Sequence, residues 1–157
     1  MRTSKLALYC VSACAIGAAM PATTLADNEI YPLTNAAYRN ECGSCHVPYP
    51  PALLDAQAWK RIMARLDQHF GSDASVDARI ADEIRTYLVG NAGRKATMPA
   101  SNGLPRITEA RWFVREHDEV PASLWKSEAV RSPANCGACH TRAEQGDYSE
   151  RTLRLPK

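Results

Sequence analysis

Apolar residues recur at helical spacing in two stretches of the first half of the chain. One face of the first stretch carries Trp59, Ile62, Met63, Leu66 and Phe70. In the second stretch the apolar positions return every four residues, at Val76, Ile80, Ile84 and Leu88. Because residues three and four apart share one face of an α-helix, these patterns predict helices over residues 54–70 and 76–89. Ser75 is the predicted N-cap of the second helix.

Two further helices are predicted outside this region. Thr34 can cap a helix that runs through Tyr38 toward Cys42, and residues 108–118 form another helical stretch ahead of Pro121. Residues 91–105 are rich in glycine, proline and basic side chains, which is typical of a junction. No part of the chain alternates apolar and polar residues over the length of a strand. The sequence therefore predicts a mostly α fold of two small lobes.

The first 26 residues have the pattern of a secretory signal peptide. Arg2 and Lys5 precede an uncharged stretch over residues 6–19, and small residues continue to Ala26. A basic start, a short apolar core and a small-residue cleavage site predict export and cleavage after Ala26. Residues 11–14 also resemble a lipoprotein cleavage box, an alternative that would leave a lipid on Cys14. No later stretch has the ~20 apolar residues of a membrane helix, so no transmembrane segment is expected in the mature chain.

Composition narrows the classes of function. The formal net charge is +2, and it falls to zero once Arg2 and Lys5 leave with the signal peptide. A chain without an excess of basic residues is not expected to bind nucleic acid. Hydrophobic residues make up 45% of the chain and charged residues 23%, which predicts a folded protein and excludes a disordered one.

The cysteines outside the signal peptide form two C-x-x-C-H motifs. Cys42, Cys45 and His46 make the first, and Cys136, Cys139 and His140 make the second. This spacing is the attachment signature of haem c. Two thiols on one turn reach the two vinyl groups of the porphyrin, and the following histidine supplies the proximal nitrogen to iron. The motifs therefore predict two covalently bound haem c groups.

Three other readings of the motifs fit less well. The two C-x-x-C pairs of a zinc ribbon lie some 15–20 residues apart, whereas Cys45 and Cys136 are far more distant in the chain. A thioredoxin-like pair needs a βαβ context, and no strand pattern lies nearby. An exported chain could instead form disulfides, but its compartment is also the one in which haem c is attached.

Two histidines remain as candidates for the second axial position of each iron. His69 lies at the edge of the apolar face that includes Leu66, and His117 follows Phe113 by one helical turn. His69 follows His46 by 23 positions and His117 precedes His140 by 23, so we expect the pairs His46/His69 and His117/His140. The count leaves crossed pairing open. Met98 is a competing ligand, because a thioether can also bind haem iron.

Several segments together resemble the periplasmic dihaem cytochrome c family. The best-studied member of that family donates electrons to the oxygen-binding sphaeroides haem protein. The resemblance covers nearly all of the mature chain. It depends on residues 41–46, Trp59, residues 66–71, residues 115–121 and residues 134–140. The His-Phe-Gly and Arg-Glu-His segments are more specific than the haem motifs, which many cytochromes share.

The resemblance implies a two-lobed, mostly helical protein with a bis-histidine haem in each lobe. The N-terminal lobe, residues 27–98, is expected to be similar to a class I cytochrome c. The C-terminal lobe, residues 99–157, is expected to have little regular structure. Redox partners in this family include a monohaem oxygen-binding cytochrome c and a membrane cytochrome of the b561 type.

The functional hypothesis is one-electron transfer in the periplasm through two low-potential bis-histidine haems. The partners would be a membrane cytochrome b and a soluble haem protein, and the protein would not be an enzyme. A six-coordinate iron has no open site for a substrate, and a second histidine keeps the potential below that of a His/Met cytochrome. One alternative is a haem enzyme or gas-binding protein with one displaceable axial histidine. Another is the dihaem electron-transfer subunit of a periplasmic reductase.

Overall fold

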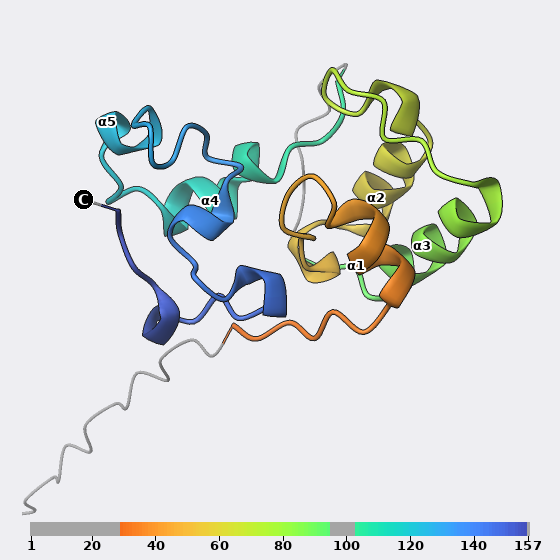
Figure 1. Ribbon diagram of the computed structural model, residues 1–157, viewed down its shortest axis with the longest axis horizontal. Coiled ribbons are helices and arrows are strands. Elements are labelled where there is room, and N and C mark those ends of the chain that lie inside the picture. Colours follow the sequence, from red (N-terminus) through yellow and green to blue (C-terminus); the bar gives the residue numbers. More distant parts are fainter. Residues whose placement is uncertain (1–28, 95–102, 157) are drawn as a thin grey trace, which may run out of the picture.

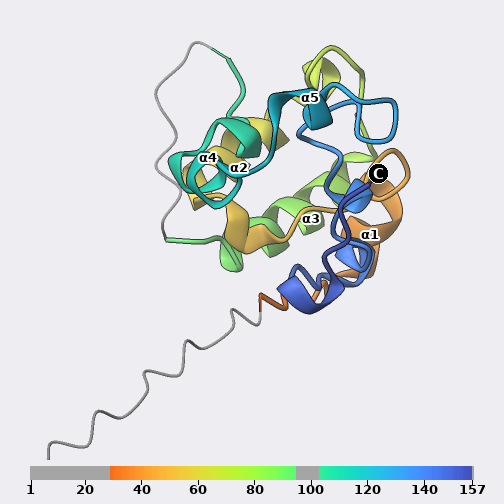
Figure 2. The same cartoon turned by 90° about the vertical axis from the view of Figure 1, so that its left-hand side faces the viewer.

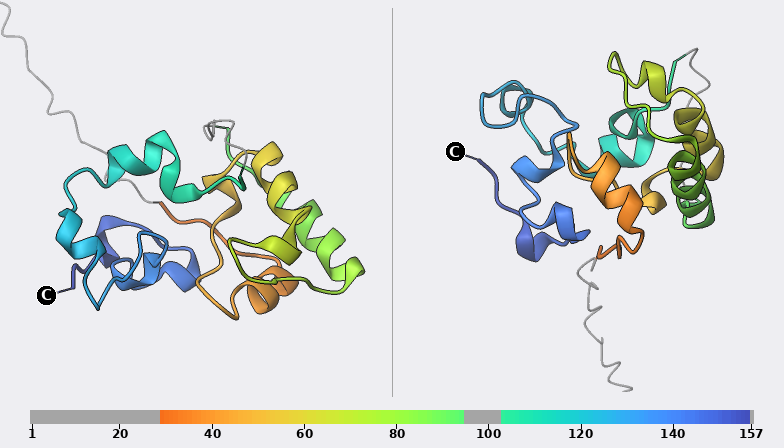
Figure 3. Two further views of the ribbon diagram at one scale, coloured as in Figure 1. Left: turned by 90° about the horizontal axis from the view of Figure 1, so that it is seen from above. Right: turned by 45° about the vertical axis from the view of Figure 1, so that its right-hand side comes forward.

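The computed structural model describes residues 29–94 and 103–156. The predicted signal peptide and Met98 lie outside the described residues. The described chain forms two halves that lie side by side, with α1 to α3 in one and α4 and α5 in the other (Figures 1 and 3). Its regular structure is helical, and only isolated bridges, without any named strand, occur in the described part. The predicted mostly α fold is therefore confirmed.

Three α-helices dominate the first half. They are α1 (Ala36–Cys42), α2 (Ala56–Met63) and α3 (Ala78–Gly90), with 3-10 turns η1 (Pro51–Leu53) and η2 (Leu66–Gln68) between them. Each α-helix begins at an acidic or amide side chain that accepts a hydrogen bond from a backbone N–H of its first turn. These N-caps are Asn35, Asp55 and Asp77. The predicted caps Thr34 and Ser75 are wrong, because the cap oxygen lies one or two residues further along.

The second half consists mostly of short turns. Its α-helices are α4 (Arg111–Glu116) and α5 (Ala122–Trp125). Its 3-10 turns are η3 (Ile107–Glu109), η4 (Cys136–Ala138), η5 (Ala143–Gln145) and η6 (Glu150–Thr152). No described helix is long and apolar enough to cross a membrane.

Two predicted helices are shorter than expected. The helix predicted over residues 54–70 ends at Met63, because Arg65 leaves helical geometry with φ −141° and ψ 43°. The chain then tightens into η2 and turns through Phe70 and Gly71, whose φ angles are 52° and 99°. The helix predicted over residues 108–118 is interrupted at Ala110, which has an extended backbone between η3 and α4. A short helical segment follows each interruption, and a predicted axial histidine is the C-cap of that segment: His69 after η2 and His117 after α4.

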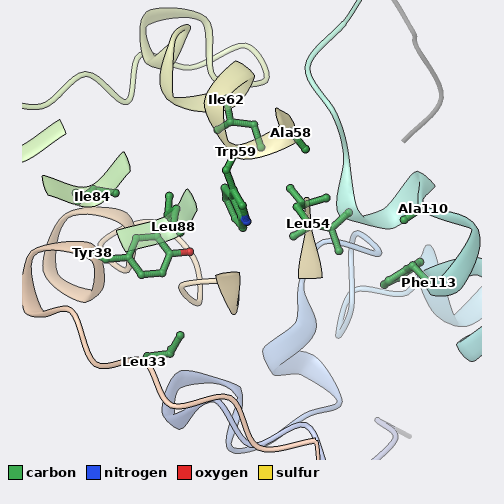
Figure 4. Packing of buried hydrophobic residues seen from close by; sticks show 11 residues of the cluster. Leu33, Tyr38, Leu54, Ala58, Trp59, Ile62, Ile84, Leu88, Ala110 and Phe113 are labelled. Carbon is green, nitrogen blue, oxygen red and sulfur yellow. The ribbon is translucent and has the colours of Figure 1, made fainter. Parts of the chain in front are cut away.

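One hydrophobic cluster extends across both halves (Figure 4). Trp59 and Ile62 of α2 pack against Ile84 and Leu88 of α3, with Leu54 fully buried beside them. The indole N–H of Trp59 donates a hydrogen bond of 2.7 Å to the carbonyl of Pro51, so the ring is fixed as well as buried. The cluster continues to three residues of the second half, Ile107, Ala110 and Phe113. The two halves therefore share a core.

The start of the described chain lies against a dark blue segment of the second half (Figures 1 and 2). Tyr31 donates a backbone hydrogen bond of 2.8 Å to Gly146, and Tyr148 donates one of 2.9 Å to Glu29. Gly146 has φ 76°, and a Cβ there would lie 2.0 Å from the carbonyl oxygen of Tyr31. Only glycine can take that conformation this close to the neighbouring chain. Residues 29–31 thus pack on the second half of the molecule.

Candidate haem sites

The first C-x-x-C-H motif begins at the last residue of α1. Cys42 is half-buried and Cys45 is exposed, so the two thiols lie where the helix opens into a loop. A Cβ on Gly43 would lie 2.2 Å from the carbonyl oxygen of Arg39, which leaves no room for a larger residue after Cys42. Nδ1 of His46 lies 2.8 Å from the carbonyl of Val47. A carbonyl only accepts, so Nδ1 donates and Nε2 keeps the lone pair that a metal needs.

The second motif forms the 3-10 turn η4. Cys136, Cys139 and His140 are all half-buried, and the amide of His140 donates 2.9 Å to the carbonyl of Cys136. This bond closes the turn and keeps the backbone of His140 close to that of Cys136. The two cysteines and the histidine of this motif line one cavity.

The predicted distal histidines follow short helical segments. His69 caps the end of η2, and its carbonyl accepts a 3.0 Å hydrogen bond from the amide of Ser72 across the Phe70–Gly71 turn. His117 caps the end of α4. Its Nδ1 donates a hydrogen bond of 2.9 Å to the carbonyl of Phe113. Its ring stacks on the Phe113 ring, with the two centroids 4.1 Å apart. Each imidazole is therefore positioned by the turn that ends its helix.

The structure brings the four histidines together in two pairs. The ring centroids of His46 and His69 are 6.4 Å apart with an angle of 13° between the planes. Those of His117 and His140 are 6.2 Å apart with an angle of 72°. Nitrogen binds a metal at about 2 Å, so two imidazoles on opposite sides of one iron place their centroids roughly 6 Å apart. Both separations fit a haem iron between the rings.

A cavity of about 380 Å³ accompanies the second pair. Cys136, Cys139, His117 and His140 all line it, together with the aromatic rings of Trp112, Phe113, Trp125 and Tyr148. The hydroxyl of Tyr148 is buried without a hydrogen-bond partner in the part of the chain that the structure describes. A large flat apolar group with polar substituents would fill this space and could bond to that hydroxyl. The second set of residues therefore fits a haem.

Burial holds these groups in the protonation states that haem attachment uses. It raises the pKa of the Cys42 thiol and of the Cys136 thiol to about 11, so both are protonated at neutral pH. Burial, and then the facing His46, lowers the pKa of His69. Burial, and then His117, lowers the pKa of His140. Neutral imidazoles bind metals, and thiols add across vinyl groups to give thioethers.

Two aromatic residues each stack on one histidine ring of the candidate sites. Phe113 stacks on His117, as described above. Tyr49 stacks on His46 with ring centroids 4.7 Å apart and 24° between the planes. Sequence reasoning did not single out Tyr49, although its place three residues after the motif histidine is a usable signal.

The four cysteines in the described residues are free, and no group of three or more metal-ligating side chains occurs in residues 29–94 and 103–156. Neither the disulfide nor the zinc reading of the motifs has support in that part of the chain. The axial-ligand reading of the histidines needs only one pair at each iron, because the porphyrin supplies the other four nitrogens.

Comparison with known proteins assigns the family. The family model described as dihaem cytochrome c matches residues 38–148. The structure of a diheme cytochrome type c from Shewanella baltica OS155 is 40% identical, with a TM-score of 0.69, and the match covers 78% of this chain and 93% of that one. A diheme cytochrome c from Rhodobacter sphaeroides is 42% identical, with a TM-score of 0.66 and coverage of 75% and 99%.

A further structure, of DHC purified from Rhodobacter sphaeroides, is 45% identical with a TM-score of 0.63 and coverage of 74% and 99%. None of the curated proteins matches the chain. The family match spans both C-x-x-C-H motifs and both remaining histidines. This chain belongs to the dihaem cytochrome c family, whose members carry two covalently attached haem c groups.

Proposed function

We propose that this protein carries single electrons through two bis-histidine haems. Cys42 and Cys45 attach the first, with His46 and His69 as its axial ligands. The second is attached and ligated by Cys136, Cys139, His140 and His117. The observation that carries the proposal is the separation of the facing rings, 6.4 Å and 6.2 Å, which suits one iron between each pair.

The residues around each pair favour electron transfer over substrate chemistry. When bound, the two haems supply reversible one-electron chemistry. An imidazole on each face occupies both axial positions, so a small molecule would have to displace a ligand to reach iron. His117 resists such displacement because its Nδ1–H is bonded to the Phe113 carbonyl and its ring is stacked on Phe113. Cytochromes of this family are generally electron carriers.

Histidine at both axial positions also predicts low reduction potentials. An imidazole donates more electron density to iron than a thioether does, and it stabilises the oxidised state relative to a His/Met cytochrome. Low potentials suit a carrier that accepts electrons from a membrane cytochrome b of the b561 type. The acceptor in this proposal is a soluble monohaem cytochrome c that binds oxygen. Redox encounters of this kind use small, transient interfaces.

The proposed location is the periplasm. Cytochromes of this family are periplasmic, and the signal-peptide pattern of residues 1–26 supplies the route of export. In this proposal residues 27–98 and 99–157 are the two haem-binding lobes. The lobes are not independent, because the hydrophobic cluster and residues 29–31 join them.

Addition of carbon monoxide to the reduced holoprotein tests the proposal. Two closed irons give no change in the absorption spectrum, whereas an iron with a displaceable histidine gives a carbonyl complex. Electron paramagnetic resonance of the oxidised protein supplies the second test. We expect two low-spin ferric signals of the bis-imidazole type. A high-spin signal, or carbon monoxide binding at one haem, would favour the gas-binding or enzymatic alternative.

A further inference from the structure

Tyr49 contacts the first histidine pair with its ring. It follows His46 by three residues, and the two rings stack at a centroid separation of 4.7 Å with 24° between their planes. A second constraint on this imidazole is the hydrogen bond from its Nδ1 to the carbonyl of Val47. The backbone of Tyr49 is itself fixed, because its carbonyl accepts a 2.6 Å hydrogen bond from the hydroxyl of buried Tyr38. The first iron ligand is therefore held between a hydrogen bond and a firmly placed ring.

The same side chain reaches the second motif with its hydroxyl. That hydroxyl donates a 2.6 Å hydrogen bond to the carbonyl of Ala134, which is 85 positions further along the chain and two residues before Cys136. The Tyr49 side chain is half-buried, so its ring packs on the first motif while its hydroxyl reaches the second. The hydroxyl can therefore serve as a fixed hydrogen-bond donor between the two segments.

A second contact joins the same two segments. A Cβ placed on Gly137, between the two cysteines of the second motif, would lie 3.5 Å from Cγ1 of Val47. Val47 directly follows His46, so the loop after the first motif packs on the turn that forms the second. The two haem attachment segments thus meet through Val47 and Tyr49, although they lie in different halves of the molecule.

We propose that Tyr49 is a positioning residue that couples the two haem sites. Its ring sets the plane of the His46 imidazole, and its hydroxyl anchors the segment that carries Cys136. Because one rigid side chain makes both contacts, the two attachment points keep a fixed separation while electrons pass between them. This inference rests on the proposed function, in which His46 is an axial ligand.

Three variants of the holoprotein separate the two contacts. Tyr49→Leu removes both the ring and the hydroxyl, and Tyr49→Phe removes the hydroxyl alone. Tyr87→Phe is the matched control, because it deletes a tyrosine hydroxyl that bonds weakly, at 3.4 Å, to the carbonyl of Pro32 in the first half. Each variant is loaded with both haems and examined in the oxidised state.

Paramagnetic resonance reads the ring contact. The shape of a bis-imidazole signal depends on the angle between the two ligand planes, so Tyr49→Leu is expected to shift the signal of one haem and leave the other in place. Tyr49→Phe and Tyr87→Phe should reproduce the wild-type signals. If Tyr49→Leu does not mature with two haems, the test is repeated with Tyr49→Met, which replaces the ring by a flexible side chain. Wild-type signals in both ringless variants would overturn the role of the ring.

Amide hydrogen exchange reads the hydroxyl contact. Loss of one neutral hydrogen bond should speed the exchange of the amides of residues 138–140 by about fivefold in Tyr49→Phe. Tyr87→Phe should leave these amides unchanged. Equal exchange in the wild type and Tyr49→Phe would overturn the anchor. If the wild-type protein itself lacked two bis-imidazole signals, the proposed function would fail. If the wild type showed both signals and the Tyr49 variants matched it in signals and in exchange rates, this inference alone would fail.

Discussion

At the scale of single residues, the two histidine pairs differ in how their rings are oriented. His46 and His69 are nearly parallel, at 13°, whereas His117 and His140 are crossed, at 72°. In each pair, one histidine ring stacks on a neighbouring aromatic ring. His117 follows the plane of Phe113 to within 19°, whereas His46 follows Tyr49 to within 24°. One histidine of each pair is therefore held by a stacked aromatic side chain.

This difference leads to a spectroscopic prediction. Parallel imidazole planes split the iron d orbitals rhombically, and crossed planes leave them closer to axial symmetry. The oxidised wild-type protein should therefore show two distinct low-spin signals, one rhombic and one strongly axial. Low-temperature paramagnetic resonance makes the measurement. Two superimposable signals would contradict the ring angles described here.

Replacement of a single axial ligand should affect a single haem. His69→Met and His117→Met each exchange an imidazole for a thioether, which favours reduced iron, so one potential should rise by on the order of 100 mV. The other potential should stay nearly constant because its ligands are unchanged. A spectroelectrochemical titration of each variant gives both potentials. A variant that retains both wild-type potentials identifies a histidine that is not a ligand.

At the scale of secondary structure, acidic or amide caps begin the helices of the first half, and tight turns end them. Asp55 accepts a 2.7 Å hydrogen bond from the amide of Ala58, and Asn35 accepts one of 2.6 Å from the amide of Tyr38. These bonds satisfy amides that the helix leaves free at its start. The starting points of α1 and α2 then fix where Cys42 and the η2 turn fall. The caps therefore contribute to the placement of both histidines of the first pair.

Removal of the cap of α2 should destabilise the protein without changing its colour. Asp55→Ala leaves the Ala58 amide without its acceptor and should lower the free energy of unfolding by about 1 kcal/mol. Glu128→Ala, the loss of an exposed carboxylate in the second half, serves as the control for the change of charge. Thermal unfolding of the holoproteins compares the two. A cap variant as stable as the control would contradict the assigned role of Asp55.

The sequence allowed the prediction of some elements and not others for identifiable reasons. The apolar spacing at Ile80, Ile84 and Leu88 predicted α3 closely, because a long amphipathic helix repeats its pattern several times. The end of α2 at Met63 was missed, since apolar residues continue at helical spacing through Leu66 and Phe70, although Leu66 is only half-buried in a 3-10 turn and Phe70 is exposed. Three-residue turns such as η4 repeat nothing, so periodicity cannot reveal them.

The candidate site was more predictable than the turns that carry it. Cysteine and histidine at fixed spacing report the chemistry of attachment directly, and the family and its two haems are confirmed. The axial roles of His69 and His117 remain predictions that the ring separations support. The link from Tyr49 to the second motif escaped notice because its hydrogen bond to Ala134 joins segments far apart in the chain, and a single sequence carries no signal for such a pairing.

At the scale of the whole molecule, the two sites lie in different electrostatic surroundings. The charged residues that line the second cavity are all glutamates: Glu29, Glu116, Glu119 and Glu150. Near the first pair, the guanidinium of Arg106 lies 4.4 Å from the centroid of the Phe70 ring, which itself contacts His69. Nearby negative charge stabilises ferric iron and lowers the reduction potential, whereas nearby positive charge destabilises ferric iron and raises the potential.

The haem held by His117 and His140 should therefore have the lower potential. Glu116→Gln removes one negative charge from the cavity rim and should raise that potential by on the order of 20 mV, the effect of a unit charge about 10 Å away in a high dielectric. The effect should shrink in high salt, because exposed charges are screened. Redox titration at two ionic strengths makes the test, and the His117→Met variant identifies which haem is being followed. A shift confined to the other haem would contradict this electrostatic account.

The pairing of residues 29–31 with Gly146 and Tyr148 bears on any attempt to dissect the protein. A fragment that starts at residue 99 would lack residues 29–31, which form hydrogen bonds with Gly146 and Tyr148. In a fragment that stops at residue 98, residues 29–31 would lose their hydrogen-bond partners Gly146 and Tyr148. Tyr49 would also lose the carbonyl of Ala134, which accepts its hydrogen bond. Each half therefore provides contacts that the other half needs. The two fragments would have to be produced together, not expressed separately as independent domains.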